Sequence, residues 1–400
     1  MTRKSLTLAE YGTSSPVQLD ARDLRVLQDV TPERLSATPI VEPGWFTLRA
    51  SSWVGTIDLE TVRVRVVPKV DDLRNVLMMF ASVSGLADWS ARTADYAEAD
   101  LVEGVAELVL RVIDQATRRG LIHGYRTRED RLPVVRGRLL ISEIAARPWD
   151  TWPAPCRYDD YTADVPENRV LLAAVKVIRQ WSVPPEVRRL SSNLVTRFEE
   201  VSVSPLPLTE ANLINEGPLN EHYLPALRLA ALVIEGAGLR HDAGELAATS
   251  FLVDMNKLYE RWIGAELTSR LWPRTQVLEQ EPVALSVRPK VSMQPDLVFR
   301  ERGNDVLVGD VKYKLTGSGF ARNADYYQLL AYTTALSLPR GILIYCQADS
   351  APGRRVTVIG GGQELVCFPL GLGGEWSEVS CRLDQLAAEI RQLSSRTAPL

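Results

Sequence analysis

Two apolar, β-branched runs flank a short polar segment in residues 294–314, which read QPDLVFRERGNDVLVGDVKYK. This pattern predicts a β-hairpin whose turn is centred on Gly303. In that register Asp296 lies opposite Asp310, and Lys312 lies on the same face because side chains alternate along a strand. A turn one residue further along would send Asp296 to the other face. The hairpin register is therefore the expectation on which a site depends.

The carboxylates of this hairpin predict a metal site. Two carboxylates at cross-strand distance within apolar strands repel each other, and a divalent cation would offset that repulsion. Asp296 and Asp310, with the Val311 carbonyl, would hold Mg²⁺, which prefers oxygen ligands. Lys312 would orient or help deprotonate an attacking water and offset charge in the transition state. Glu260 is the best further carboxylate, able to bind a second metal ion or to position the first through water.

The alternative for the Asp310–Lys312 pair is an ordinary surface ion pair, which contributes little to stability. The partner Asp296 and the preceding helix with Glu260 favour a metal-dependent nuclease site instead.

Gln328 and Tyr332 lie four residues apart in NADYYQLLAYTTAL and share one face of a helix predicted at about 323–337. In one interpretation this helix packs on the sheet through Leu329 and Leu330, and Gln328 is partly exposed. In the other, Gln328 and Tyr332 lean toward the phosphate or the general base. The sequence leaves both open.

Composition limits the class of protein. The chain has 400 residues, 46% of them hydrophobic, which predicts two or three domains. It contains no apolar run of roughly 18 residues and no signal-peptide pattern, so a cytoplasmic location is expected. Four cysteines without CxxC spacing argue against a zinc ribbon or a disulfide framework and predict buried free thiols. The net charge of −4 neither requires nor excludes nucleic acid.

The hydrophobic periodicity predicts a mixed fold, α+β with an α/β part. Residues 1–100 are expected to be β-rich, with a hairpin or small barrel turning near Leu59–Glu60. Residues 101–245 are expected to be mainly helical, and residues 246–400 to form an αβββαβ domain. The predicted elements of that domain are a helix at 251–271, capped by Ser250, strands at about 275–285, 289–299 and 305–314, a helix at 323–337 and a strand at 341–346, followed by further strands and a final helix.

These motifs resemble known nucleases. PD, then DxK fourteen residues later, then QxxxY on a helix, in an αβββαβ order, is similar to the PD-(D/E)xK nuclease superfamily. Across most of its length the chain resembles the McrC family, the endonuclease subunits of McrBC modified-cytosine restriction systems. The segments that carry this resemblance are EYG (10–12), WVGTI to VVPKV (53–70), VVRGRLL (134–140), DDYTADVPENRVLLAA (159–174), FLVDMNKLYERWI (251–263) and PD to GDVKYK (295–314).

The resemblance implies catalytic roles for Asp296, Asp310 and Lys312 on double-stranded DNA. It also implies a partner, a hexameric AAA+ GTPase ring (McrB) that recognises and translocates modified DNA. The N-terminal part of a McrC-like chain inserts into that ring and stimulates its GTPase. The chain itself has no GxxxxGK[ST] phosphate loop, which agrees with this division of labour. The β-rich start and Arg136–Arg138 become candidates for the ring contact, although such arginines are more often paired at the surface.

The expected protein is therefore a cytoplasmic, Mg²⁺-dependent DNA endonuclease subunit of an anti-phage McrBC-like complex, which cuts poorly alone. Two other functions stay open. One is a non-catalytic adaptor that only activates an AAA+ NTPase ring, and the other is a stand-alone nuclease of the same fold acting in repair or on RNA.

Overall fold

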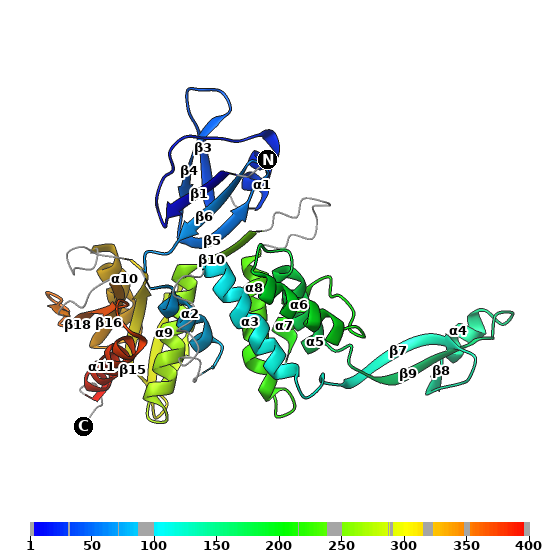
Figure 1. Cartoon of the computed structure of the whole chain (residues 1–400). Helices are drawn as coiled ribbons and strands as arrows, with labels where there is room; N and C mark the ends of the chain where they lie inside the picture. Colours follow the sequence, from blue (N-terminus) through cyan, green and yellow to red (C-terminus); the bar gives the residue numbers. More distant parts are fainter. Residues whose placement is uncertain are drawn as a thin grey trace. The chain divides into compact units, whose positions relative to one another are not determined.

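The computed structural model describes residues 4–30, 33–70, 72–86, 100–214, 216–237, 250–286, 288, 291–314, 323–347 and 353–395. The protein is a mixed α/β structure, as predicted (Figure 1). It divides into two compact units, residues 1–105 together with 246–400, and residues 106–245. The predicted division into three parts stays a prediction, and its boundary at 245 lies outside the described residues.

The first unit begins with two small sheets, ordered β1-β6-β5-β10 and β2-β4-β3. The elements are β1 (Lys4–Ala9), β2 (Val17–Gln18), α1 (Ala21–Val30), β3 (Leu35–Pro39), β4 (Trp45–Ala50), β5 (Trp53–Asp58), β6 (Val62–Val67), α2 (Leu73–Val83) and β10 (Ser250–Asp254). β5 and β6 form the hairpin predicted about Leu59–Glu60, with Ile57 paired to Val64. Both of these side chains are fully buried, because alternate residues of the two strands face one core.

The helix predicted at 251–271 begins four residues later than expected. Residues 250–254 form β10, which pairs antiparallel with β5 and leads directly into α9 (Met255–Leu271). Asp254, not Ser250, caps the helix by accepting a hydrogen bond from the Asn256 N–H at 3.0 Å. The prediction was wrong because a short apolar run cannot be assigned to strand or helix by its periodicity alone.

The larger sheet of the first unit has six strands in the order β11-β14-β15-β16-β18-β17. β15, β16 and β18 are parallel to one another, and the other pairings are antiparallel. The elements are β11 (Gln276–Glu279), β14 (Leu297–Glu301), β15 (Asn304–Lys312), α10 (Asn323–Ala335), β16 (Arg340–Gln347), β17 (Arg354–Thr357), β18 (Glu364–Gly371) and α11 (Trp376–Ser395). With α9 in front, the main sheet follows the predicted αβββαβ order.

Two of the predicted strands are each broken in two. The extra pieces, β12 (Val283–Ser286) and β13 (Val291–Met293), form a separate two-stranded ribbon. β11 ends before Gln280, whose φ is +52°, and Pro282 follows. Pro295 separates β13 from β14. Proline has no N–H to donate to a sheet, so these positions interrupt strands that the apolar pattern alone predicts as continuous.

The β14–β15 hairpin has the predicted register at the site. Leu297 pairs with Gly309, so Asp296 lies opposite Asp310. Asp310 is therefore on the same face of its strand as Lys312, two residues further on. The convergence predicted from the alternation of side chains is confirmed.

The turn of this hairpin differs from the prediction. It consists of Arg302 and Gly303, both with positive φ (50° and 84°), rather than being centred on Gly303. A turn of this kind suits the right-handed twist of the two strands. It pairs Arg300 with Asp305, and Val306 then forms a bulge that shifts the rest of the hairpin by one residue. The bulge compensates for the shorter turn and restores the predicted pairing.

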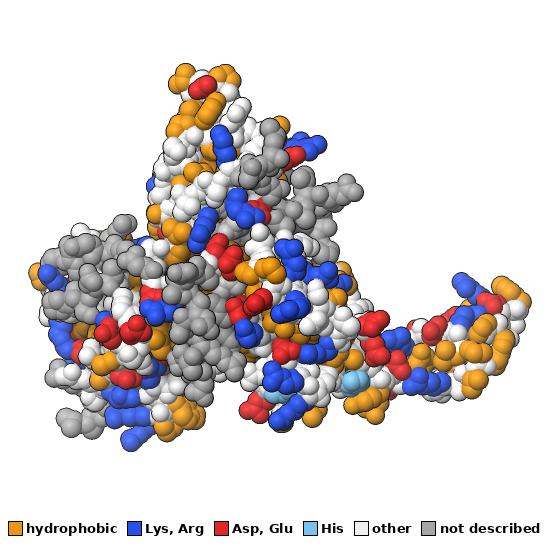
Figure 2. All heavy atoms as spheres, viewed as in Figure 1, with side chains coloured by type: hydrophobic (Ala, Val, Ile, Leu, Met, Phe, Trp, Pro, Cys, Tyr) orange, Lys and Arg blue, Asp and Glu red, His pale blue; other side chains and the backbone are white. Residues whose placement is uncertain are grey.

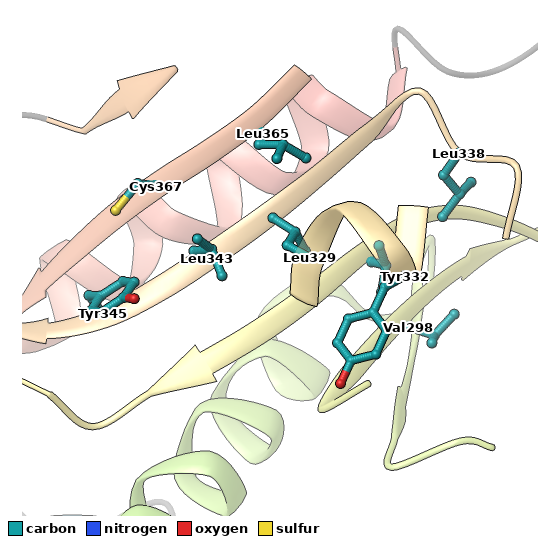
Figure 3. Packing of buried hydrophobic residues seen from close by; sticks show 9 residues of the cluster. Val298, Leu329, Tyr332, Leu338, Leu343, Tyr345, Leu365 and Cys367 are labelled. Carbon is teal, nitrogen blue, oxygen red and sulfur yellow. The ribbon is translucent and has the colours of Figure 1, made fainter. Parts of the chain in front are cut away.

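Helices pack on both faces of the six-stranded sheet. On one face, Leu329 and Tyr332 of α10 join a core with Val298, Leu343 and Leu365 (Figure 3). α9 and α11 also contact this sheet, and Tyr259 of α9 lies against Tyr313, whose side chain is on the opposite face from Lys312. Because Val308 belongs to the α10 core, Asp310 and Lys312 also lie on the α10 face of β15.

The second unit combines a helical bundle with a long hairpin. Its helices are α3 (Leu101–Thr117, beginning in the first unit), α4 (Ile141–Ala146), α5 (Pro166–Ile178), α6 (Pro185–Arg197), α7 (Pro207–Leu213), the 3-10 helix η2 (Glu221–Tyr223) and α8 (Leu224–Gly236). α5 packs against α6, α7 and α8.

The prediction of a mainly helical middle region missed the hairpin. β7 (Gly124–Leu132) pairs along its whole length with β9 (Ala154–Thr162), whose other edge pairs with β8 (Arg138–Leu139). We call residues 124–162, which include α4, the arm; it extends away from the bundle formed by the other helices of its unit (Figure 1). Its strands have mostly exposed or half-exposed side chains. Charged residues occupy both faces of β7, so the sequence has no apolar face to signal a strand.

Two expectations from composition concern the cysteines and the membrane. Cys156, Cys346 and Cys367 are buried and free, as predicted, whereas Cys381 is exposed. Within the described residues, no helix has the length and apolar character that crossing a bilayer requires.

Candidate active site

Asp310, near the end of β15, is fully buried. Its Oδ2 lies 2.7 Å from the Lys312 Nζ, an ion pair outside hydrogen-bond geometry, and its Oδ1 has no hydrogen-bond partner among the described residues. Burial raises the pKa of the Asp310 carboxyl above its usual 3.8, Lys312 opposes the rise, and Asp296 adds to it. A buried carboxylate with an unused oxygen is unfavourable in a structure that does nothing with it.

Asp296 is held in place by two hydrogen bonds. Its Oδ2 accepts from the Val311 backbone N–H at 2.8 Å, and its Oδ1 accepts from the Gln280 side chain at 2.9 Å. The Lys312 Nζ lies 3.9 Å from Oδ2. Since the N–H and C=O of one strand residue point to the same side, the Val311 carbonyl is directed to the side on which Asp296 lies.

Lys312 lies between the two carboxylates and is mostly buried. Burial lowers the pKa of its ammonium group, but Asp310 and Asp296 together raise it above the usual 10.5. At neutral pH the side chain is therefore a cation. In this arrangement it can stabilise negative charge and donate hydrogen bonds, and its part in orienting or deprotonating a water stays a prediction.

Glu260, on α9, is half-buried and lies within electrostatic range of Asp296, Asp310 and Lys312. Burial raises its pKa to about 7, the negative charge of Asp296 adds to the rise, and Lys312 opposes it. The described residues contain no cluster of three or more His, Cys, Asp or Glu side chains that could hold a metal ion. The centre of the site is therefore formed by the carboxylates of Asp296 and Asp310. Glu260 interacts with them electrostatically, and a contact through water is its predicted role.

Gln328 and Tyr332 are joined by a hydrogen bond along α10. The Gln328 side chain is exposed, and its Nε2 donates to the Tyr332 hydroxyl at 2.7 Å. Burial raises the pKa of Tyr332, the bond from Gln328 lowers it, and the charge of Asp310 raises it again. Tyr332 therefore lies within electrostatic range of the carboxylates, and Gln328 reaches the site through it. The role predicted for Gln328 stays a prediction.

The donor set fits a hard divalent cation. Asp310 offers an unused oxygen, Asp296 has both oxygens oriented, and the Val311 carbonyl is directed toward them. Mg²⁺ is usually bound by one or two carboxylates, with water and substrate phosphate completing its shell. When both aspartates and Glu260 are ionised, the charge of one lysine does not neutralise them, so a bound cation favours the ionised state that burial opposes.

Sequence reasoning missed Gln280. It follows β11, in which Glu279 pairs with Leu297, so Gln280 lies opposite Asp296. Its backbone N–H also donates to the Asp296 carbonyl at 3.1 Å. The signal was the pairing of β11 with β14, which depends on a tertiary register that the sequence of either strand does not reveal.

The comparisons with known proteins agree with this fold. A family model described as "McrBC 5-methylcytosine restriction system component" matches residues 48–346. A chain in the solved half-complex of Thermococcus gammatolerans McrB AAA+ hexamers with bound McrC is 17% identical and has a TM-score of 0.60, covering 97% of this chain and 100% of that one. The Thermococcus gammatolerans McrBC complex gives a second match, 19% identical over 67% of this chain and 88% of that one, with a TM-score of 0.45. No curated protein sequence matches the chain.

Proposed function

Since the chain belongs to the family of McrBC 5-methylcytosine restriction system components, we propose that it is the DNA-cleaving subunit of such a system. In this proposal residues 246–400 are a restriction-endonuclease-like domain that hydrolyses phosphodiester bonds of double-stranded DNA with Mg²⁺. The partner is an AAA+ GTPase ring, whose GTPase the chain stimulates. The complex acts in the cytoplasm against phage DNA.

Asp310 carries the proposal, because its buried, unpartnered oxygen is best explained by a ligand that uses it. Asp296 and Asp310, with the Val311 carbonyl, would hold the Mg²⁺, and Glu260 would act through water. When bound, the metal ion supplies Lewis-acid polarisation of the scissile phosphate and an activated water. Lys312 supplies positive charge against the negative charge that develops on the phosphate.

Gln328 has a secondary role in this proposal. Its hydrogen bond fixes the Tyr332 hydroxyl, which lies within electrostatic range of the carboxylates. Through that hydroxyl, Gln328 would help orient the phosphate or the attacking water.

The test is co-purification with an McrB-type AAA+ GTPase, followed by cleavage of methylated and unmethylated plasmid. Asp310→Ala is expected to abolish cleavage and to leave stimulation of the GTPase unchanged. The matched control is Asp305→Ala, on the same strand, where the carboxylate pairs with Arg300 at 2.7 Å near the turn. If Asp310→Ala cuts as well as the wild type, the site assignment is wrong.

The same experiment separates the other two functions. A non-catalytic adaptor would stimulate the GTPase while the wild-type complex leaves both plasmids intact at every Mg²⁺ concentration. A stand-alone nuclease would cut DNA or RNA equally well without the GTPase.

The arm is the surface that best fits the partner. Its exposed apolar side chains include Val134, Ile141, Trp149 and Trp152, and Figure 2 shows hydrophobic side chains gathered over its end. An exposed apolar group of this kind, interspersed with charges, is typical of a protein interface. The similar fold in a McrB–McrC assembly supports a ring of AAA+ subunits as the occupant. We propose in addition that residues 1–100 and Arg136–Arg138 contact the GTPase ring.

Trp149→Ala combined with Trp152→Ala is expected to weaken binding to the GTPase by at least about tenfold, because exposed tryptophans often dominate interfaces. Trp272→Ala, which removes a tryptophan that is 71% exposed in the first unit, is the control. The affinity is measured by titrating the GTPase activity with each variant. If the double variant binds as tightly as the wild type, the arm is not part of the interface.

A further inference from the structure

A polar cluster surrounds Tyr313, at the end of β15. Tyr313 is only 2% exposed, and its hydroxyl donates to Glu10 Oε2 at 3.2 Å. The Lys69 ammonium donates to the Tyr313 carbonyl oxygen at 2.8 Å and lies 3.8 Å from the centre of the Tyr313 ring. The Lys69 backbone N–H donates to the same Glu10 oxygen at 3.2 Å. Three segments far apart in the sequence, EYG, VVPKV and DVKYK, therefore meet at one place.

Stability alone does not explain this cluster. Glu10 is 7% exposed, and its Oε1 has no hydrogen-bond partner among the described residues. Burial raises the pKa of Glu10 and lowers that of Lys69, and each charge only partly compensates the other. Glu10 is buried and Lys69 is half-buried, and replacing charged groups at such a place by well-packed apolar side chains is often neutral or stabilising. The geometry that the pair enforces is thus the better explanation for it.

The cluster fixes the backbone directly after Lys312. Tyr313 follows Lys312 in the chain, so the bond from Lys69 to the Tyr313 carbonyl restrains the peptide unit just beyond the strand that carries Asp310. The Tyr313 ring also contacts the Tyr259 ring of α9, with centroids 5.5 Å apart. Tyr259 precedes Glu260, so one aromatic contact links the two elements that carry the site.

The same N-terminal sheet holds the start of α9. The Ser52 carbonyl, just before β5, accepts a hydrogen bond from the Met255 N–H at 3.0 Å. The Ser52 hydroxyl donates to the capping carboxylate of Asp254 at 3.0 Å. The sheet of β1, β6, β5 and β10 is therefore attached to β15 through Lys69 and to α9 through Ser52.

We infer that Lys69, oriented by Glu10, is a positioning residue for the site: it fixes the end of β15 so that Lys312 and Asp310 keep their geometry. The expected effect on cleavage rests on the proposed nuclease function. The expected effect on the end of β15 does not depend on that function. A restraint on one peptide unit matters because displacements of about 1 Å can reduce a reaction rate up to about a hundredfold.

The test compares Lys69→Met with Lys69→Arg and with Arg63→Met, all in the full-length chain. Arg63 lies on β6, in the sheet that precedes Lys69, and pairs with Asp58. No hydrogen bond or ion pair joins it to β15 within the part of the chain that the structure describes. Hydrogen–deuterium exchange of the peptide covering residues 309–314 measures the restraint, and single-turnover cleavage with the GTPase partner measures its consequence. Urea unfolding measures global stability.

Lys69→Met is expected to speed exchange of that peptide by about tenfold or more, since a local restraint is lost. Exchange of the peptide covering residues 304–308 should not change. Cleavage should fall on the order of tenfold, while stimulation of the GTPase is retained. Lys69→Arg, which can still donate to the Tyr313 carbonyl, should recover most of both effects, and Arg63→Met should behave as the wild type.

The inference is wrong if residues 309–314 exchange in Lys69→Met at the same rate as in the wild type. It is also wrong if Arg63→Met speeds this exchange and slows cleavage as much as Lys69→Met does. If Lys69→Met does not fold, Glu10→Gln, which keeps the size of the side chain, is expected to change the same peptide by about threefold through the weakened hydrogen bonds. If the wild-type complex never cuts DNA, the proposed function is wrong. Hydrogen–deuterium exchange of residues 309–314 would then still test whether Lys69 positions the end of β15.

Discussion

The β14–β15 hairpin and the arm are both antiparallel and rich in charged residues, but they place their charges in opposite surroundings. On β15, Asp310 is fully buried, with an oxygen that has no hydrogen-bond partner. On the arm, Glu129 and Arg157 pair across the strands, and both side chains are 51% exposed. The arm arginines 126, 128, 131 and 136 likewise pair with acidic residues.

The difference separates charges that serve solubility from charges that serve chemistry. A cross-strand pair in water has nearly the same free energy whether or not it forms. A carboxylate removed from water without full compensation is unfavourable, and its presence calls for a ligand. The same residue types therefore carry information about function only where the fold buries them.

The largest effect is expected from Lys312→Met, which should reduce DNA cleavage by about 10²–10³-fold, because in the proposed function it removes the charge that stabilises the phosphate. Arg300→Met removes a cation from the partner strand β14, where it pairs with Asp305 and Glu281. Single-turnover cleavage with the GTPase partner compares the two. If Arg300→Met slows cleavage as much as Lys312→Met does, the burial of Lys312 does not set it apart from Arg300.

A pH titration of stability tests the burial of the Glu10 carboxyl. Burial raises the pKa of Glu10 from 4.5 to about 7, with Lys69 and Tyr313 opposing and Asp254 adding to the rise. The folded protein therefore holds a proton that the unfolded chain has lost, and the free energy of unfolding contributed by Glu10 falls as pH rises from about 4.5 to 7. The full difference is at most about 3 kcal/mol.

Urea unfolding of the wild type and Glu10→Gln measures this dependence. The stability difference between them should shift in favour of Glu10→Gln as the pH rises through that range. A constant difference for Glu10→Gln would show that its carboxyl titrates normally.

Glycine substitutions test the backbones of the two hairpins. An alanine Cβ at Gly137 of the arm would lie 2.4 Å from the Arg157 carbonyl oxygen, and φ there is +67°. Gly303 has a φ of +84° with no atom within 4 Å of such a Cβ. Gly137→Ala is expected to weaken the arm by about 2 kcal/mol or more, and Gly303→Ala its hairpin by about 1 kcal/mol.

Amide exchange of residues 154–162 and of residues 304–312 measures these two local losses. Equal effects would indicate that the close approach of Gly137 to β9 does not restrain the arm.

The smallest effect is expected from Glu129→Gln, which breaks an exposed ion pair with Arg157. It should change the free energy of unfolding by less than about 0.5 kcal/mol. A loss several times larger, measured by urea unfolding, would contradict the contrast between the two hairpins.

Local rules were enough to predict the centre of the candidate site. Alternation along β15 places Asp310 and Lys312 on one face, and the pairing of Leu297 with Gly309 brings Asp296 to them. The prediction was right there even though the turn was wrong, because the bulge at Val306 compensates for the turn. The periodicity could not reveal that bulge, because one inserted residue leaves both apolar runs intact.

Contacts between distant segments were beyond the sequence. Gln280 meets Asp296 only because β11 pairs with β14, and Lys69 meets Tyr313 only because the N-terminal sheet packs beside β15. The run Phe251–Val253 is apolar in either a helix or a strand, and its pairing with β5 decides which. The arm lacks an apolar face, so its pairing has no hydrophobic signature at all.

The pairing of β10 with β5 also bears on how the molecule can be cut for study. A fragment that starts near residue 246 would keep β10 but lose the strand beside it. The N–H and C=O groups of Ser250–Asp254 would then form an open edge, flanked by the buried side chains of Phe251, Leu252 and Val253. Such an edge is a template for aggregation. A soluble fragment would need polar replacements on that strand, or β1, β5 and β6 supplied as a separate peptide.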